Sequence, residues 1–275
     1  MMGISNIVST IERKYIYKLL KKGKRIDGRE LFDIREISIK TNIIPKAEGS
    51  ADIELGKTRV ICGIKYDIGS PFSDSPDEGV ATCMAEFVPF ASPMFEGGPP
   101  TIDSIELARI IDRGIRHGNC IDYKKLCIKK EKYCYILFID IYIMNYYGNL
   151  IDASGVAAIA ALISAVIPSA KLTLDETNIE WDGKFMPIPI NELPIQITFG
   201  KIDDIVFIDP SLPEELIQDG RISFAITESN KISSIQKSGP ALWEQDEIIK
   251  LSRIAIQKAN DLRKKLNLRQ YIPKL

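Results

Sequence analysis

The sequence predicts an α+β fold, a mixed α/β arrangement in which helices cover the sheets, and three observations lead to this prediction. Segments with strand-type alternation come in runs, and helical segments separate these runs instead of alternating with single strands. The chain has 275 residues, of which 45% are hydrophobic and 27% charged, so it can bury a sizeable core in one large domain or two moderate ones. No low-complexity segment and no short repeat interrupts the pattern.

The first half of the chain combines a terminal helix with strands. Ile7, Ile11, Tyr15 and Leu19 follow at steps of four, which predicts a helix over residues 6–22 with these side chains on one face. Alternating apolar and polar residues predict strands, and stretches rich in glycine and proline predict exposed loops. The expected strands cover residues 50–55, 59–66 and 81–90, with a turn at Gly56-Lys57 and loops over residues 69–79 and 92–100.

The second half adds the internal helices. A helix over residues 102–116 directs Leu107, Ile111 and Ile115 inward. A strand over residues 133–147 leads into an alanine-rich buried helix over residues 151–167, which Pro168 stops. The remaining expected elements are a turn at Asp182-Gly183, strands over residues 195–199 and 205–208, a short helical or turn segment over 213–220, a hairpin of residues 221–227 and 231–237, and a closing helix over 242–266.

Charge is nearly balanced over the whole chain. The net charge is −1, which argues against a protein that binds RNA alone through a global positive field. Residues 13–29 contain eight Lys or Arg against one Asp, and residues 250–274 contain eight against one. We interpret both runs as the solvated faces of terminal helices.

The side chains that usually build metal centres or nucleophilic sites are scarce. The five cysteines have no C-x-x-C spacing, and His117 is the only histidine, so we expect no metal site and no Ser-His-Asp or Cys-His catalytic group. An odd number of cysteines in apolar surroundings is typical of buried thiols in a reducing compartment. Without a secretory segment or a long apolar span, we expect a soluble cytoplasmic protein with no membrane contact and no cofactor.

One helix start resembles a phosphate site that lacks its cation. Residues 149–156 end a strand and open a helix with small residues, a geometry that directs backbone N–H groups at an anion. Asp152 and Ser154 could also be simple helix caps. No Lys or Arg occurs between Leu150 and Ala170, and a phosphate nucleophile usually needs such a side chain.

The helix over residues 102–116 offers a second candidate. Arg109, Arg113 and Arg116 share the face opposite its apolar side, where guanidinium groups could clamp phosphates. A solvated face with internal pairs is the alternative, because Asp112 and Arg116 are four residues apart and Glu106 lies one turn from Arg109.

Four motifs in the same order resemble the RNase PH family, and within it the non-catalytic RNase PH-type subunit of the archaeal exosome core. They are Arg25-Ile-Asp-Gly-Arg29, Gly49-Ser-Ala-Asp-Ile-Glu-Leu-Gly56, Gly98-Pro-Pro100 followed by Ile105-Glu-Leu-Ala-Arg-Ile-Ile-Asp-Arg113, and Ile235-Gln-Lys-Ser-Gly239. The resemblance implies an RNase PH-like fold of two packed sheet and helix layers with terminal helices. We expect an N-terminal helix in residues 1–24, domain 1 in 25–185 and domain 2 with the closing helix in 186–275.

The sequence departs from the active members of that family at two places. They carry a Gly-Thr-Arg-type phosphate loop where this chain has residues 153–156, and a pair of aspartates where it offers Glu192 alone, with no acid upstream until Asp182. A single carboxylate without an anion loop is a poor general acid or metal site. We therefore expect no catalytic residue and interpret Glu192 as structural.

The resemblance also implies partners. It implies a trimer of heterodimers with a catalytic RNase PH-like subunit, RNA-binding cap subunits, and RNA contacted by Arg109 and Arg113, with Arg116 as a weaker candidate. Two alternatives stay open at this point. One is an active phosphorolytic 3′–5′ exoribonuclease that uses Glu192 and an arginine from elsewhere, and the other is an RNA-binding protein that acts alone through its basic termini.

Overall fold

The computed structural model describes residues 10–173 and 179–273, and its elements follow the predicted order closely. The helices are α1 (Thr10–Lys21), α2 (Ile102–His117), α3 (Leu150–Ser164), α4 (Leu212–Ile217) and α5 (Gln245–Leu266). The strands are β1 (Ile37–Thr41), β2 (Gly49–Leu55), β3 (Thr58–Gly69), β4 (Val80–Phe87), β5 (Cys127–Lys129), β6 (Tyr133–Asn145), β7 (Val166–Leu172), β8 (Ile179–Pro187), β9 (Ile195–Ile202), β10 (Ile205–Ile208), β11 (Gly220–Ile226) and β12 (Ile232–Ser238).

The larger sheet has six strands, in the order β1-β2-β3-β6-β4, and β5 pairs with β6 beside this path. The hairpin of β2 and β3 turns at Gly56-Lys57 as expected, and Ala51, Ile53 and Leu55 face the core. All of its pairings are antiparallel except that of β4 with β6, which is parallel. A parallel neighbour needs a crossover, because two parallel strands cannot be joined by a tight turn.

The second sheet is antiparallel, in the order β10-β9-β11-β12. The predicted strands over residues 195–199 and 205–208 are confirmed as β9 and β10, and the predicted hairpin is confirmed as β11 and β12. The segment expected to be helical or turned, 213–220, overlaps α4, which begins one residue earlier and ends at Ile217.

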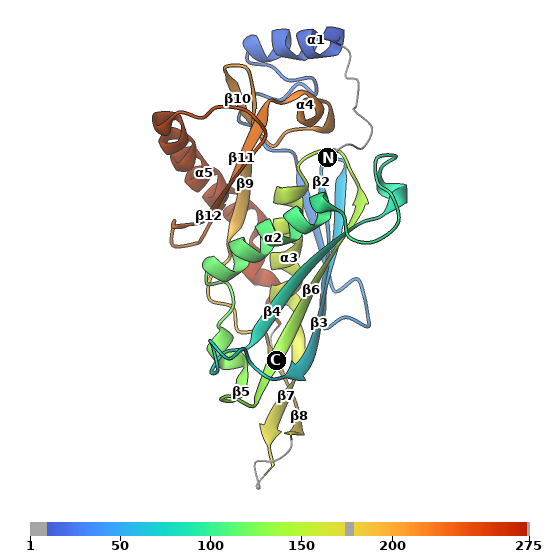
Figure 1. The fold of residues 1–275 in the computed structure, drawn as a ribbon, viewed down its shortest axis with the longest axis vertical. Helices are drawn as coiled ribbons and strands as arrows, with labels where there is room; N and C mark the ends of the chain where they lie inside the picture. Colours follow the sequence, from blue (N-terminus) through green and yellow to red (C-terminus); the bar gives the residue numbers. More distant parts are fainter. Residues whose placement is uncertain (1–9, 174–178, 274–275) are drawn as a thin grey trace.

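Helix α3 lies between the two sheets and is buried from Ile151 to Ser164 (Figure 1). Its many alanines allow strands β2 and β3 on one side and β9 on the other to approach it closely. Helix α2 packs on β4, α3 and β12, and helix α5 covers β9 and β11. One hydrophobic core therefore joins both sheets. This agrees with the predicted arrangement of two packed sheet and helix layers with terminal helices.

Helix α1 forms where the sequence predicts it, but it buries a different face. Ile11 is 79% exposed and Tyr15 55%, whereas Ile16 and Leu20 are buried. The buried face of α1 is the one that finds apolar contacts elsewhere in the chain. Ile16 and Leu20 pack against a small apolar cluster made of Ile202, Phe207 and Ile217. The remaining part of the predicted helix, residues 6–9, lies outside the described residues.

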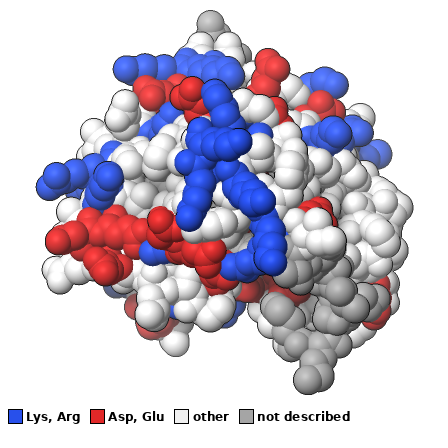
Figure 2. Space-filling model, turned by 90° about the horizontal axis from the view of Figure 1, so that it is seen from above, with Lys and Arg blue, Asp and Glu red and all other residues white. Residues whose placement is uncertain are grey.

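The basic run over residues 13–29 divides into two kinds of side chain. Its lysines are exposed on and after α1, and Figure 2 shows Lys and Arg side chains gathered at this end of the molecule with Asp and Glu beside them. Its arginines are not simply solvated: Arg13 pairs with Asp219 at 2.9 Å, and Arg25 is buried. The expectation of a fully solvated face holds for the lysines alone.

The segment after α3 differs from the prediction. The helix ends at Ser164, and residues 166–172 form strand β7, which contains Pro168 and pairs with β8 in a two-stranded sheet. Pro168 is tolerated because a proline can sit at an irregular position of an outer strand. Asp182-Gly183 lies inside β8, where Gly183 has φ +72°, and does not form the expected turn. Residues 174–178 are outside the described part of the chain.

Candidate functional site

Helix α2 presents the predicted arginine face to solvent. Thr101 caps its first turn by accepting a hydrogen bond from the backbone N of Ser104 at 3.2 Å, which fixes where the helix begins. Leu107, Ile111 and Ile115 are buried as expected. Arg109, Arg113 and Arg116 are all exposed on the opposite face.

The three arginines differ in how many hydrogen bonds and ion pairs they already make within the chain. Arg116 pairs with Asp112 at 3.0 Å and donates to the carbonyl of Ala81 at 3.1 Å, and its hydrogen bond to Asp112 raises its pKa. Arg113 donates to the side chain of Gln236 on β12 at 3.1 Å. Arg109 has no hydrogen bond or ion pair with any described residue. Arg116 therefore uses most of its donors within the chain, whereas Arg109 and Arg113 keep more donors free for a phosphate chain.

The alternative of a solvated face with internal pairs placed Glu106 one turn from Arg109, but these two side chains form no ion pair among the described residues. Glu106 instead lies 3.6 Å from Arg221 on β11. Because β11 carries a better placed cation, the carboxylate turns away from its own helix face, and Arg109 is left available.

The start of α3 is filled by the chain itself. Asn149, with φ 56°, accepts from the backbone N of Asp152 and donates to the carboxylates of Asp152 and Asp209 at 2.8 Å and 2.7 Å. Thr198 on β9 donates to Asp152 from its backbone N at 3.1 Å and from its hydroxyl at 2.7 Å. All four residues are buried, so this helix start forms no accessible anion site.

The pKa values of the two buried carboxylates in this network are shifted in opposite directions. Burial raises the pKa of Asp152 to about 7, against the hydrogen bonds from Asn149 and Thr198. Burial also acts to raise the pKa of Asp209, but the hydrogen bonds and charge of Arg35, together with Arg29, lower it below its usual range. Arg35 contacts Asp209 through Nε at 2.9 Å and through Nη2 at 2.7 Å.

The first family motif also belongs to this network. Arg25 and Glu214 form a completely buried ion pair, and Arg25 donates further to the carbonyls of Ile208 and Asp209 at 2.6 Å and 2.8 Å. Arg29 reaches Asp209 at 2.9 Å. The motif Arg25-Ile-Asp-Gly-Arg29 therefore fastens the N-terminal segment to β10 and α4.

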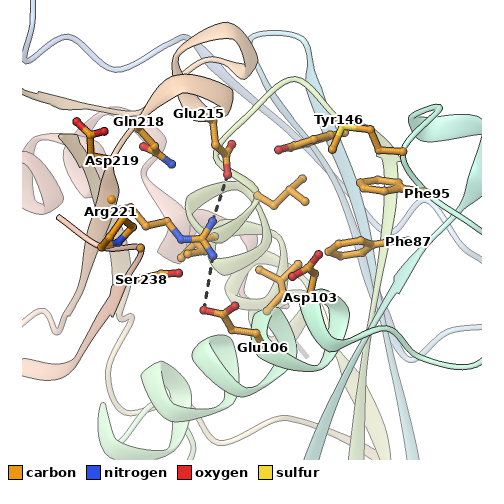
Figure 3. A pocket seen from close by; sticks show the side chains of 17 residues that line it. Phe87, Phe95, Asp103, Glu106, Tyr146, Glu215, Gln218, Asp219, Arg221 and Ser238 are labelled. Atoms are coloured by element: carbon orange, nitrogen blue, oxygen red, sulfur yellow. Dashed lines mark hydrogen bonds and ion pairs between the residues drawn. The ribbon is translucent and has the colours of Figure 1, made fainter. Parts of the chain in front are cut away.

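A pocket of about 340 Å³ opens between α2, β11 and α4, beside the first turn of α3 (Figure 3). Its charged lining consists of Asp103, Glu106, Glu215, Asp219 and Arg221. Arg221 is the single cation among the lining residues, and it is bound between Glu215 at 3.2 Å and Glu106 at 3.6 Å. An anion entering here would meet excess negative charge and a guanidinium that is already neutralised.

Glu192 lies away from this pocket. It is half-buried and accepts a hydrogen bond from the backbone N of Ser229, in the turn between β11 and β12, at 3.1 Å. Asp182, the next acid upstream, contacts Ser169 and Lys171 in the β7–β8 hairpin. Neither carboxylate lines the pocket, so the alternative of an enzyme acting through Glu192 has no geometric support.

A group of acids near α3 was not predicted from the sequence. They lie in Asp209-Pro-Ser-Leu-Pro-Glu-Glu215, which follows the apolar strand β10. A signal was present: Ser211 and Glu214 have the spacing of a capping box, and Ser211 N donates to Glu214 at 2.8 Å. An acid at the end of a buried strand, followed by a capped helix, places several carboxylates at one sheet edge.

No group of three or more His, Cys, Asp or Glu in the described ranges could hold a metal ion. The five cysteines are free, and burial raises the pKa of the Cys62 and Cys120 thiols. No helix among the described residues is long and apolar enough to cross a membrane.

Comparison with known proteins agrees with this geometry. A model of the 3′ exoribonuclease family, domain 1, matches residues 33–168, and a model of domain 2 of the same family matches residues 192–258. The chain therefore belongs to the RNase PH family of 3′ exoribonucleases.

Within this family the chain is similar to components of archaeal exosomes. The exosome complex component Rrp42 of Thermococcus kodakarensis is 43% identical over 265 residues, which cover 96% of this chain and 97% of that protein. Rrp42 of Methanosarcina mazei is 43% identical over 263 residues, with 96% of each chain covered.

Solved structures give the same picture. A chain of an Archaeoglobus fulgidus exosome with RNA bound to the active site has a TM-score of 0.86 and 38% identity, covering 93% of this chain and 98% of that chain. A chain of an archaeal exosome core has a TM-score of 0.82 and 34% identity, covering 94% and 96%. The predicted family and the RNase PH-like α+β fold are confirmed.

Proposed function

We propose that this chain is a non-catalytic subunit of an archaeal exosome-type 3′–5′ RNA-degrading complex, where it structures the active site of a catalytic partner and contributes to RNA binding. One observation carries the proposal: the pocket beside α3 is acidic, and its single lining cation, Arg221, is held between Glu106 and Glu215. Phosphorolysis needs a bound phosphate, and this lining repels one. Similarity to Rrp42 over nearly the whole chain agrees with this role.

The proposed assembly is a trimer of heterodimers with a catalytic RNase PH-like subunit, carrying RNA-binding cap subunits and working in the cytoplasm. Its support is similarity to chains of an archaeal exosome core and of an exosome with RNA in its active site. Within the chain we propose an N-terminal helix in residues 1–24, domain 1 in 25–185 and domain 2 in 186–275, in keeping with the two family models.

The proposed RNA contact is the exposed face of α2. Arg109 has no competing partner among the described residues, and Arg113 has only a neutral one, Gln236. Arg116 is held by Asp112 and by the carbonyl of Ala81, so we assign it the weakest contribution.

The test is a phosphorolysis assay on the purified chain, on the catalytic RNase PH-like subunit of the same organism, and on their mixture. We expect release of nucleoside diphosphates to be absent from the chain alone and highest for the mixture. Phosphate-dependent release by the chain alone would refute the non-catalytic role. Tight RNA binding by the chain alone, with a steep salt dependence, would instead favour the stand-alone RNA-binding protein.

A further inference from the structure

Two of the five cysteines face each other across a strand pairing. Cys127 on β5 is the register partner of Cys134 on β6, and the two strands are antiparallel. Residues directly opposite each other in such a pair have side chains on the same face of the sheet, with Cα atoms about 4.5–5.5 Å apart. A disulfide needs Cα atoms about 4.4–6.8 Å apart, so this register meets the distance that the bond requires.

The other three cysteines, all within the described ranges, form no second pair of this kind. Cys62 on β3 is the register partner of Ile141, and Cys83 on β4 is the partner of Ile139. Strand β6 therefore lies between these two thiols. Neighbouring strands are about 4.8 Å apart, so β3 and β4 are about 10 Å apart, which is too far for a disulfide. Cys120 lies between α2 and β5 and belongs to no strand.

The two facing thiols differ in how far solvent reaches them. Cys127 is partly exposed, whereas Cys134 is fully buried. A dissolved oxidant can therefore reach Cys127 first, and Cys134 is available to a sulfur that is already held inside the protein. This order suits a first thiol that reacts with the oxidant and a second thiol that resolves the intermediate.

The acidity of the two thiols sets the pace of such a reaction. Burial raises the pKa of both thiols, Asp77 adds to the effect at Cys127, and the Cys127 thiol adds to the effect at Cys134. The influence of one thiol on the other agrees with their close approach. Because the thiolate is the nucleophile, a raised pKa slows the reaction at neutral pH. The pair is therefore suited to a slow structural cross-link and not to a rapid sensor.

A bond at this position would join a short strand to the larger sheet. Strand β5 has three residues and pairs with β6 beside the main strand order (Figure 1). The 3-10 turn Tyr123–Leu126 directly precedes β5, and the carbonyl of Tyr123 accepts a hydrogen bond at 2.8 Å from the backbone N of Gly79, one residue before β4. A cross-link at Cys127 would therefore also hold the turn that supports the start of β4.

From this register and exposure we propose that Cys127 and Cys134 are a reversible disulfide site, oxidised by thiol–disulfide exchange with a low-molecular-weight disulfide. In the first step the Cys127 thiolate bonds to one sulfur of that disulfide, and the other sulfur leaves as a thiolate. In the second step the Cys134 thiolate attacks the Cys127 sulfur, and the second small thiolate leaves. The two protein thiols have then lost two electrons and two protons, which the small disulfide has gained as it becomes two thiols. This site goes beyond the proposed role in RNA degradation and does not depend on it.

The test is incubation of the intact chain with oxidised glutathione at about pH 8.5, where thiolates are more abundant, followed by mass spectrometry. We expect the intact mass to fall by two hydrogen atoms and two of the five free thiols to be lost. Lys129, Lys130 and Lys132 lie between the two cysteines, so trypsin separates them and the disulfide joins two peptides that reduction releases. The melting temperature should rise by about 5 °C on oxidation, because closing a short loop restricts the unfolded chain.

Three variants separate this pair from the other thiols. Cys134→Ala should stop after the first step and keep glutathione on Cys127. Cys127→Ser should leave Cys134 reduced, because Cys134 is buried. Cys83→Ala is the matched control, since it removes another partly exposed strand thiol, and it should form the disulfide at the rate of the unmodified chain.

Several results would overturn the assignment. Retention of all five thiols, or a linkage between any other two cysteines, would show that the register pair has no special reactivity. A lasting glutathione adduct on Cys127 of the unmodified chain would show that Cys134 does not reach it. An unchanged or lower melting temperature after oxidation would show that the folded sheet does not accommodate the bond. The phosphorolysis assay tests the non-catalytic role separately.

Discussion

The guanidinium of Arg25 and the carboxylate of Glu214 form an ion pair with no solvent exposure on either side chain, although 189 positions separate them in the sequence. The pair joins the segment after α1 to helix α4. Because both charges have left water, each depends on the other and on the carbonyls around Arg25. The N-terminal segment is thereby a structural part of the second sheet layer.

Removing one member of this pair should destabilise the fold strongly. Arg25→Gln leaves the Glu214 carboxylate buried without its cation, and we expect a loss of about 3–5 kcal/mol in the free energy of unfolding. Urea unfolding followed by circular dichroism measures it. Lys24→Gln is the control, because its pair with Glu30 is exposed and contributes little. Equal losses in both variants would contradict the buried pair.

Asp152 should make stability depend on pH near neutrality. Its folded-state pKa is about 7 against 3.8 as the ordinary value, so the folded protein holds this proton more tightly than the unfolded chain. The resulting stabilisation is complete below about pH 4 and is lost as the pH rises through 7. Between pH 5 and pH 7 the loss is about 2 kcal/mol.

Asp152→Asn removes this dependence. Unfolding curves of both proteins at several pH values should therefore differ by an amount that changes across this window. Asp209 does not interfere, because its lowered pKa confines its effect to the range below about pH 4. A constant difference between the two proteins from pH 5 to pH 8 would show that Asp152 is ionised throughout.

The arginine face of α2 should set the RNA affinity of the assembled complex. Arg109→Gln and Arg113→Gln together should weaken RNA binding and reduce the slope of log K against log salt by about 1.4, since each contact to a single strand contributes about 0.7. Arg116→Gln should change less, because Asp112 already holds that side chain. The matched control is Arg253→Gln, an exposed arginine on α5. Identical salt slopes for all variants would show that the arginines of α2 do not contact RNA.

Glu192 should not affect turnover. Among the described residues its hydrogen-bond partner is the backbone N of Ser229, and it lies outside the pocket. Glu192→Gln should therefore leave the phosphorolysis rate of the assembled complex within about twofold of the unmodified complex, because an amide oxygen can accept the same hydrogen bond. A loss of activity in this variant, with the complex intact by gel filtration, would restore the catalytic alternative.

Gln196 should couple two helices. Its amide lies between Gly114 of α2 and Gly155 of α3, and a Cβ added at Gly155 would lie 2.0 Å from its side-chain oxygen. The amide cannot move away from a new methyl group at Gly155, because its other side packs against Gly114. Gly155→Ala should therefore lower the free energy of unfolding by about 1–3 kcal/mol. Combining it with Gln196→Ala should recover much of that loss in a double-mutant cycle. Gly63→Ala, which meets only an ordinary contact, is the control.

The sequence patterns predicted those elements whose signal is local. The β2–β3 hairpin follows from alternation around Gly56-Lys57, and the two faces of α2 follow from helical spacing. Periodicity could not show which face of α1 is buried, because Ile11 and Ile16 lie on two different apolar faces of the helix. The face with Ile16 is buried because it packs against Phe207, which is distant in the sequence. Periodicity also could not locate the end of α3, because Val166 and Ile167 suit a strand as well as a helix.

The arrangement of the candidate site was predicted in part. The exposed arginines on α2 follow from spacing, and the missing cation near α3 follows from composition. That the α3 start is sealed depends on Thr198 and Asp209, which lie far along the chain and reach Asp152 and Asn149 only after folding. Similarly, Arg221 is recognisable as neutralised only once Glu106 and Glu215 are beside it.

The position of α3 between the two sheets has a consequence for biosynthesis. The helix and the larger sheet leave the ribosome first, whereas the strand that covers the other side of the helix, β9, is made later. Until then the nascent chain displays an apolar surface that has no partner within itself. Completion of the hydrophobic core therefore waits for the C-terminal third, and we expect a chain interrupted after β8 to be recognised by chaperones and proteases.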